Sequence, residues 1–319
     1  MQLHYSDHFV LPLPEGHRFP MRKYRDLRDT LAQALPQARF VEAPAASAGE
    51  LALAHVPSYV DAVLHGHLSA AQQREIGFPW SPQMAERSRR SVGASIAAAR
   101  AALQEGISAN LAGGTHHASA DAGSGFCVFN DVAVAARLMQ AEWHRQHRRL
   151  LRVAVIDLDV HQGNGTAAIL ADDPTVWTLS MHGQNNFPFR KVAGDDDVAL
   201  PDGCGDEAYL AALDAALERL WAAHPDGPPG LAFYIAGADV HEGDRLGRLK
   251  LTAEGVAERD RRVYAALRQR AVPVAISMGG GYGVDLAATV AVQCRTLMLA
   301  WDDWLARGAR QTGALRGPT

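Results

Sequence analysis

Residues 152–167 read RVAVIDLDVHQGNGTA, an apolar run that passes directly into carboxylates, a histidine and glycines. A short apolar run bounded by polar turn residues is typical of a strand that is buried on both faces of a sheet. We therefore predict a strand at Arg152–Leu158. Asp157, Asp159 and His161 alternate along the chain, so a strand that stays extended would place all three side chains on one face.

Two carboxylates on one buried face repel each other unless a cation lies between them, and aspartate and histidine together are good zinc ligands. The competing interpretation is a helix cap, which we prefer for a single aspartate at a strand end. Here two aspartates and a histidine stand at alternate positions after a purely apolar strand. For this pattern we favour a metal or catalytic site.

The same succession of apolar run, polar turn and helical stretch recurs along the 319 residues. Strands that alternate with long helices predict an α/β domain whose parallel sheet is covered on both faces. Ligands of such sheets bind beyond the carboxyl ends of the strands. The other predicted strands are Ser108–Ala112, Val176–Met181, Leu231–Ala236 and Val272–Met278, and the predicted helices are Arg22–Leu35, Gln83–Glu105, Asn130–Arg145, Asp206–Ala223 and Ala253–Arg270, with Asn130 and Asp206 as N-caps.

A second strand end, in LAFYIAGADVHEGDRLGRL at residues 231–249, carries Asp239. This carboxylate is a candidate third metal ligand from another strand, although a lone aspartate is as often a turn residue. Two aspartates and one histidine leave a fourth coordination position open for water or substrate, which is typical of a catalytic metal site. We assign no role to His241 or Glu242.

A third strand end, in VAISMGGGYGVD at residues 274–285, places Tyr282 directly after three glycines. Glycines permit a close approach of the backbone, and a tyrosine held there could donate its hydroxyl to a developing oxyanion. A lone glycine-rich tyrosine loop is usually only a turn. The prediction that it contributes to catalysis therefore depends on the other strand ends.

The fourth stretch, LAGGTHHASADAGSGFC at residues 111–127, sets His116 and His117 side by side among small residues. An isolated pair of this kind is more often on the surface or satisfied in the core. Beside three other polar strand ends, one histidine is better interpreted as a general base and the other as its partner. We predict that Asp157 and Asn164 orient the two rings.

Composition excludes several classes of protein. The net charge of −4 and the pI near 6.4 argue against a general nucleic-acid binder, which would carry a basic face. The three cysteines are far apart and form no CxxC pair, so we expect neither a disulfide scaffold nor a cysteine-rich zinc knuckle. No apolar run reaches about 18 residues and no signal peptide is evident, so we expect a cytoplasmic protein without a membrane span.

The four motifs LAGGTHHASADAGSGFC, IDLDVHQGNGT, GADVHEGDRLGRL and GGGYG, in this order, resemble those of the zinc-dependent histone deacetylase superfamily. The DRLGRL segment and the short N-terminal region look most similar to class IV deacetylases and their bacterial relatives. The resemblance extends from about residue 3 to 300. It implies a single catalytic domain over residues 1–319 with the arginase/deacetylase fold, in which helices flank a central eight-stranded parallel sheet.

The resemblance also implies a site. It places one zinc ion per chain on Asp159, His161 and Asp239, with His117 as general base and acid, His116 beside it, and Tyr282 at the oxyanion. It implies Asp157 and Asn164 behind the histidines, a substrate tunnel lined by Gly125, Phe126, Phe187 and Gly280, and a structural potassium ion near Asp157, Ser180 and Met181. The segment HGQNNFPFRK departs from the class I pattern, which leaves the tunnel width and the acyl preference open.

The implied reaction is metal-assisted hydrolysis of an amide, which removes an acetyl or longer fatty acyl group from a lysine side chain or a related amine. A small-molecule acetylpolyamine amidohydrolase would use the same catalytic residues. A dimanganese ureohydrolase of the arginase type is disfavoured, because Gly163 and His241 stand where its second metal would need carboxylates. A silent binding module is disfavoured because the ligands, both histidines and the tyrosine are all present.

Overall fold

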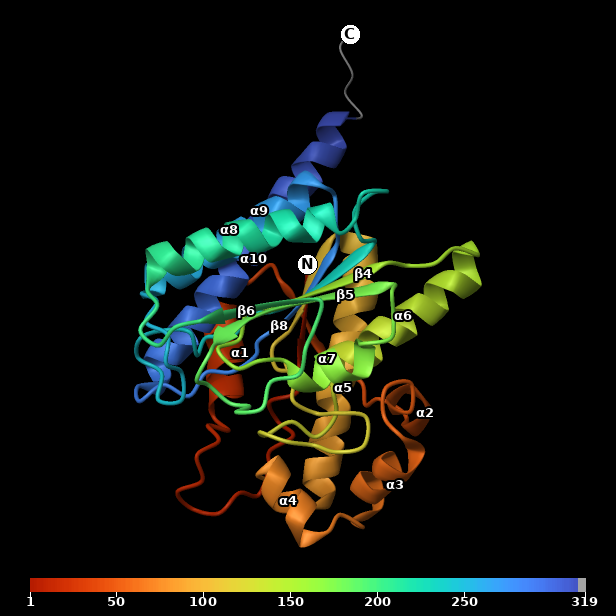
Figure 1. Cartoon of the computed structure of the whole chain (residues 1–319), viewed down its shortest axis with the longest axis vertical. Coiled ribbons are helices and arrows are strands. Elements are labelled where there is room, and N and C mark those ends of the chain that lie inside the picture. Colours follow the sequence, from red (N-terminus) through yellow and green to blue (C-terminus); the bar gives the residue numbers. More distant parts are fainter. Residues whose placement is uncertain (315–319) are drawn as a thin grey trace.

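The computed structural model describes residues 1–314, and it describes side chains as far as residue 308. The described residues contain one eight-stranded sheet, in which all strands are parallel (Figure 1). Residues 315–319 of the predicted domain lie outside this range. The strands, in order across the sheet, are β2 (Arg39–Glu42), β1 (Gln2–Tyr5), β3 (Ile107–Asn110), β8 (Val274–Ser277), β7 (Leu231–Ile235), β4 (Val153–Asp157), β5 (Val176–Gly183) and β6 (Asp196–Leu200).

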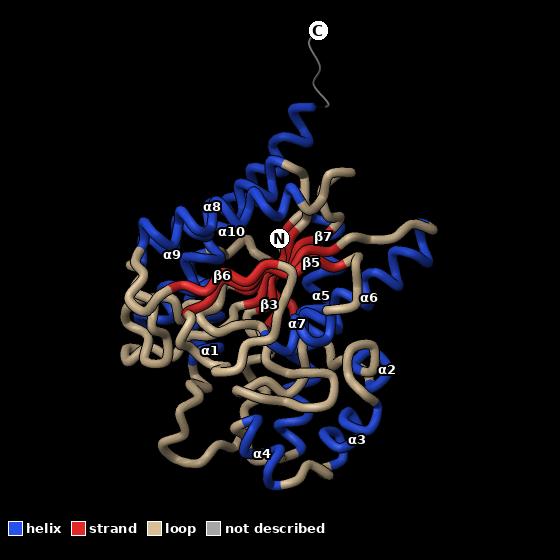
Figure 2. The backbone as a smooth tube through the Cα atoms, viewed as in Figure 1, coloured by secondary structure: helices blue, strands red, loops and turns tan. Residues whose placement is uncertain are grey.

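Helices cover both faces of the sheet, which forms the central layer in Figure 2. Successive β4 residues point to opposite faces, so Ala154 and Ile156 join one core and Val153 and Val155 join the other. The first core is covered by α1 (Lys23–Ala34), α8 (Asp206–Ala222), α9 (Ala253–Gln269) and α10 (Leu286–Ala314). The second is covered by α2 (Ala48–Leu51), α3 (Pro57–His65), α4 (Ala70–Ile76), α5 (Pro82–Glu105), α6 (Asp131–His147) and α7 (Asn164–Leu170).

All five predicted strands and all five predicted helices are confirmed, with ends that differ by no more than two residues. The strands that the prediction missed are β1, β2 and β6. Of these, β2 and β6 are the edges of the sheet, where half-exposed positions interrupt the apolar run that identifies a buried strand. The missed helices are α2, α3, α4, α7 and α10, most of them too short to show a periodic pattern.

One of the two predicted N-caps is wrong. Asn130 does cap α6, since its side chain accepts a hydrogen bond from the Ala133 backbone N–H. The Asp206 carboxylate instead accepts from the backbone N–H and the hydroxyl of Thr252, at 2.9 and 2.7 Å. Gly205 is the N-cap of α8 and contributes no side-chain bond. The aspartate therefore joins the start of α8 to the start of α9, a long-range contact that local sequence does not indicate.

The fold gathers the four motifs on the side of the sheet where the strands end. Because β3, β8, β7 and β4 are consecutive neighbours and all run parallel, their carboxyl ends lie together. The segments after β3 and β8 touch backbone to backbone: a Cβ added at Gly114 would lie 2.5 Å from the Gly279 Cα. Gly114 also has a φ of +67°, which favours glycine.

Among the residues that the structure describes, none of the helices combines the length and the apolar character that crossing a bilayer requires.

We expect Gly93→Ala to lower the free energy of unfolding by about 1–3 kcal/mol, because its Cβ would overpack a closed contact. Gly93 lies inside α5, and an added Cβ would come within 1.9 Å of the Pro44 carbonyl oxygen. Urea denaturation measures the change. Gly49→Ala is the matched control, because a Cβ there meets nothing within 4 Å. Equal destabilisation of the two variants would contradict the assignment of a tight α5 contact.

Candidate active site

Three predicted metal ligands meet in one buried cluster. Ligand atoms of Asp159, His161 and Asp239 all lie within 4.8 Å of one another. The other Asp239 oxygen, Oδ1, accepts from the Val160 backbone N–H at 3.0 Å, which fixes the carboxylate. Among the described residues, no hydrogen bond is directed at Asp239 Oδ2, although it is buried and lies 3.2 Å from His161 Nδ1. A buried carboxylate oxygen without a donor fits a metal ligand.

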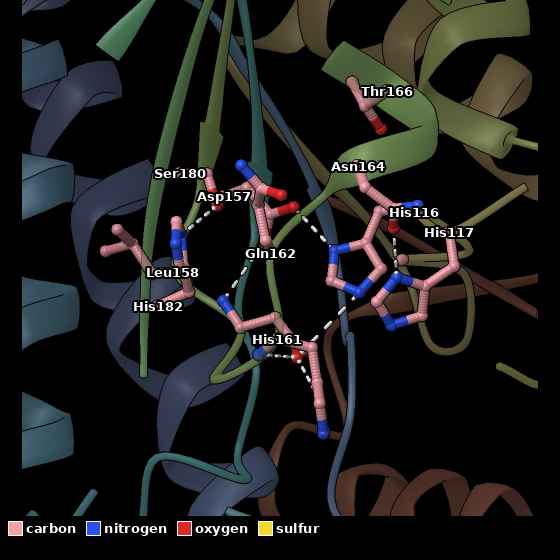
Figure 3. Close-up of polar contacts among 12 residues, drawn as sticks. His116, His117, Asp157, Leu158, His161, Gln162, Asn164, Thr166, Ser180 and His182 are labelled. Atoms are coloured by element: carbon pink, nitrogen blue, oxygen red, sulfur yellow. Dashed lines mark hydrogen bonds and ion pairs between the residues drawn. The ribbon is translucent and has the colours of Figure 1, made fainter. Parts of the chain in front are cut away.

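The cluster forms because the chain turns after β4. The alternation of polar residues suggested a strand that stays extended through His161. The structure differs from this expectation. The strand ends at Asp157, and the Asp159 and His161 backbone N–H groups donate to Asp157 Oδ1 at 3.1 Å and to Asp159 Oδ1 at 2.9 Å. Asp157 therefore turns to His116 (Figure 3), and Asp159 lies beside Asp239 instead.

The charges of this cluster call for a cation. Burial and the neighbouring Asp159 raise the pKa of Asp239 to about 7. Burial alone would lower the pKa of His161, but its hydrogen bond to Asp159 and the charges of Asp239 and Asp159 outweigh that effect and raise the pKa to about 10. A proton on the imidazole thus offsets only one of the two carboxylate charges. A divalent metal would supply that charge instead and would use the imidazole nitrogen as a ligand.

The two adjacent histidines have different partners (Figure 3). His116 Nδ1 lies 2.6 Å from Asp157 Oδ2, whereas His117 Nδ1 lies 2.7 Å from Asn164 Oδ1. Burial would lower the pKa of His116, but the Asp157 and Asp159 charges outweigh it and raise the pKa to about 9. Burial, with the nearby His116, holds the pKa of His117 well below its usual range. The amide oxygen only accepts, so His117 carries its proton on Nδ1 and keeps the Nε2 lone pair for a base.

One cavity of about 520 Å³ is lined by both histidines, by Asp159 and His161 of the cluster, and by Tyr282. Burial raises the pKa of Tyr282 well above its usual value, so the hydroxyl stays protonated and able to donate. The tyrosine backbone is held from both sides: its N–H donates to Asp244 Oδ2 at 2.6 Å, and its carbonyl accepts from Arg245 Nε at 2.8 Å.

The predicted tunnel residues line the same cavity. Gly125 lies between two rings, since a Cβ there would come within 2.8 Å of His117 Cδ2 and 3.1 Å of a Phe187 ring carbon. The Phe126 ring lies 5.9 Å from that of Tyr282, between centroids. Gly280 contacts the metal cluster directly, because its backbone N–H donates to Asp159 Oδ2 at 2.5 Å. A side chain at any of these glycines would intrude on the site.

Comparison with known proteins identifies the family. A family model described as "Histone deacetylase domain" matches residues 17–298. The chain belongs to the histone deacetylase family. The family hydrolyses amide bonds, so this protein is a hydrolase of that class. The comparison does not confirm the class IV subtype.

Individual relatives agree with this assignment. The chain is 43% identical over 284 residues to an uncharacterised protein of Picosynechococcus, covering 88% of this chain and 92% of the relative. It is 36% identical over 206 residues to Histone deacetylase 2 of Arabidopsis thaliana, covering 64% of this chain but only 51% of the relative. It is 30% identical over 263 residues to the acetoin utilization protein AcuC of Bacillus subtilis, covering 76% of this chain and 65% of the relative.

Solved structures support the fold. The crystal structure of an HDAC homologue in complex with SAHA superposes with a TM-score of 0.78 at 22% identity, covering 95% of this chain and 83% of that one. An HDAC homologue from Aquifex aeolicus superposes with a TM-score of 0.77 at 21% identity and the same coverage. The predicted arginase/deacetylase fold, with its eight-stranded parallel sheet, is thereby confirmed.

The residues predicted for a potassium ion lie behind the histidines. Ser180 of β5 is paired in register with Asp157 of β4, and buried Met181 follows it. The Ser180 hydroxyl lies 3.0 Å from His182 Nδ1 (Figure 3). Potassium at this place stays a prediction.

Sequence reasoning missed Arg259, a fully buried residue of α9 that connects the two strand ends which carry the metal cluster. Its Nη1 donates to the carbonyls of Leu158 and Gly237, at 3.2 and 2.7 Å, and its Nη2 lies 2.8 Å from Asp260 Oδ1. The sequence held a signal for it: Arg259 and Asp260 fall on the helix face that otherwise buries Val256 and Val263. A charged pair on an apolar face indicates a buried polar network.

We expect Arg259→Lys to weaken binding of a divalent metal about tenfold, as loss of an outer partner of a metal site does. Lysine keeps a charge for Asp260 but lacks the planar fork that bridges two carbonyls. Zinc titration against a competing chelator measures the affinity. Arg261→Lys is the control, because Arg261 is an exposed arginine of the same helix. Equal metal affinity in both variants would show that Arg259 does not position the cluster.

Proposed function

We propose that this protein is a zinc-dependent deacylase that removes acyl groups, from acetyl to longer fatty acyl, from lysine side chains of peptides or proteins. One observation carries the proposal. A buried cluster of two aspartates and one histidine contains an oxygen that lacks a donor, and Asp159 and His161 of this cluster line a cavity together with a neutral histidine and a protonated tyrosine. These are the groups that amide hydrolysis requires.

Zinc would be held by Asp159, His161 and Asp239, and when bound it supplies a Lewis acid that polarises the acyl carbonyl and acidifies water. The rest of the chemistry belongs to this chain. His117 Nε2 accepts a proton from the attacking water as the new carbon–oxygen bond forms. The Tyr282 hydroxyl donates to the oxyanion.

The histidine pair then returns the proton to the leaving nitrogen, the carbon–nitrogen bond breaks, and a carboxylate and a free amine leave. Asn164 keeps the His117 ring in the tautomer that can accept, and Asp157 holds His116 in the charged form beside it. The positive charge of His116 disfavours a second positive charge on His117. The protonated His117 is therefore a strong acid toward the leaving amine.

A second candidate is hydrolysis of acetylated polyamines, which needs the same catalytic groups. Glu75 in the cavity lining favours a cationic substrate, whereas Arg18 and Arg248 in the same lining oppose one. We therefore rank lysine deacylation first. The class IV subtype, the cytoplasmic location and a potassium ion near Asp157, Ser180 and Met181 belong to the same proposal. The subtype is supported by the DRLGRL segment after Asp239.

We expect purified protein to bind one zinc per chain. Loss of a residue that only hydrogen-bonds to a metal ligand weakens metal binding roughly 10–100-fold, and we expect Asp239→Asn, which alters a ligand itself, to weaken it more. The neutral amide removes a ligand charge without changing the size of the side chain. Metal analysis and calorimetric titration measure both quantities. Asp202→Asn, which removes an exposed carboxylate paired with Arg248, is the control. Two manganese ions per chain would instead support the ureohydrolase alternative.

We expect hydrolysis of acyl-lysine peptides, and a loss of kcat of about a hundredfold or more in Tyr282→Phe, as for removal of one oxyanion donor. Peptides that carry acyl chains from acetyl to myristoyl report the length that the cavity accepts. Rates that rise with chain length indicate a fatty deacylase, and activity confined to acetyl indicates a deacetylase. A zinc-loaded protein that hydrolyses no acyl-lysine peptide would refute lysine deacylation, and acetylpolyamines would then be tested.

A further inference from the structure

The cavity that holds the catalytic groups also contains a buried cation that the proposed reaction does not use. Arg87 lies near the start of α5, is only 7% exposed and lines the cavity together with His117 and Tyr282. Tyr24 and Phe19 lie on either side of it: the guanidinium carbon is 4.5 Å from the Tyr24 ring centroid and 5.9 Å from that of Phe19. This wall of the cavity is therefore positively charged.

Arg87 lacks an anionic partner. Among the side chains of residues 1–308, which the structure describes, no carboxylate lies within ion-pair distance of Arg87. Its Nη1 donates to the Phe9 carbonyl over a long distance of 3.5 Å. Burial lowers the pKa of Arg87, and the Tyr24 hydroxyl, which is its side-chain hydrogen-bond partner, and then the charge of Asp7 oppose this effect. Asp7 itself, however, is paired with Arg28 at 2.9 Å. The Tyr24 hydroxyl and the Phe9 carbonyl are neutral, so they accept from the guanidinium without neutralising its buried charge.

The lining between the catalytic groups and Arg87 is apolar enough for a hydrocarbon chain. Phe19, Phe78, Phe126 and Leu11 all line the cavity. The three phenylalanine rings form a continuous set, since the Phe19 ring centroid lies 4.9 Å from that of Phe78 and 5.5 Å from that of Phe126. A ligand that fits both features has methylene groups followed by a terminal anion.

Resting on the proposed deacylase function, we propose that Arg87 forms a carboxylate subsite that selects dicarboxylic acyl groups, such as glutaryl, on the substrate amine. The apolar rings contact the methylene groups, and the guanidinium binds the terminal carboxylate in the bidentate geometry that arginine and carboxylate share. The released acid of any acyl group is also a carboxylate, so the test must separate a substrate carboxylate from a product one.

The test compares a glutaryl-lysine peptide with its uncharged isostere, in which methyl groups replace the terminal carboxylate oxygens. We expect wild-type kcat/KM to favour the glutaryl peptide by about tenfold or more, the worth of a charge-assisted hydrogen bond. Arg87→Met should abolish or reverse this ratio, and Arg87→Lys should retain part of it. Because the ratio is measured within each variant, a general loss of stability does not imitate the effect. Arg89→Met, on the same helix but outside the cavity lining, should keep the wild-type ratio.

Each failure has a separate meaning. Wild-type turnover of acetyl and isostere peptides without a preference for glutaryl would overturn the subsite and keep the deacylase function. Arg87-dependent binding of the glutaryl peptide in calorimetry, without turnover of any peptide, would keep the subsite and overturn the function. If acetate inhibits wild type more strongly than Arg87→Met while no glutaryl preference exists, Arg87 binds the released acid, and substrate selection by Arg87 is overturned.

Discussion

Two carboxylates buried beside one imidazole are the constraint on which the rest of this structure depends. Asp159 and Asp239 come from the ends of neighbouring strands β4 and β7, and no water-exposed surface relieves their repulsion. Unpaired charges in such a place are strongly unfavourable. The protein supports them with backbone N–H groups from Val160 and Gly280 and leaves one oxygen without a donor. A resident cation is the simplest way to complete this arrangement.

The surrounding fold keeps that arrangement rigid. Arg259 connects the backbones of the two segments that carry the candidate metal ligands, since it donates to carbonyls of both. The Gly114–Gly279 contact packs the segment of His116 and His117 against the segment of Tyr282. Asp131, at the start of α6, accepts hydrogen bonds from the Gly114 and Thr115 backbone N–H groups at 3.1 and 2.8 Å. The Gly114–Gly279 contact and the Arg259–Leu158 hydrogen bond join parts of the chain that are distant in sequence, whereas the Asp131 bonds are more local. The groups proposed for catalysis would need little reorganisation during reaction on such supports.

The division of labour between the two histidines follows from their partners. A carboxylate behind His116 favours its charged form, and an amide behind His117 provides no charge to do so. In the lining of the same cavity, Arg87 has only neutral hydrogen-bond partners, the Tyr24 hydroxyl and the Phe9 carbonyl, and no carboxylate within ion-pair distance among the described side chains. In a buried cavity such differences in partner decide which groups are charged, because water does not screen them.

The sequence by itself determined the parallel α/β architecture and the four polar strand ends, because apolar runs and glycine turns are local patterns. It also indicated Asp157 and Asn164 as partners of the histidines, since each stands beside a predicted ligand or turn. Only the tertiary structure decided that the chain turns at Asp157, that Asp206 links α8 to α9, that Arg259 bridges the Leu158 and Gly237 carbonyls, and that Arg87 is buried. These features depend on contacts between distant segments, and no periodicity along the chain records which segments will meet.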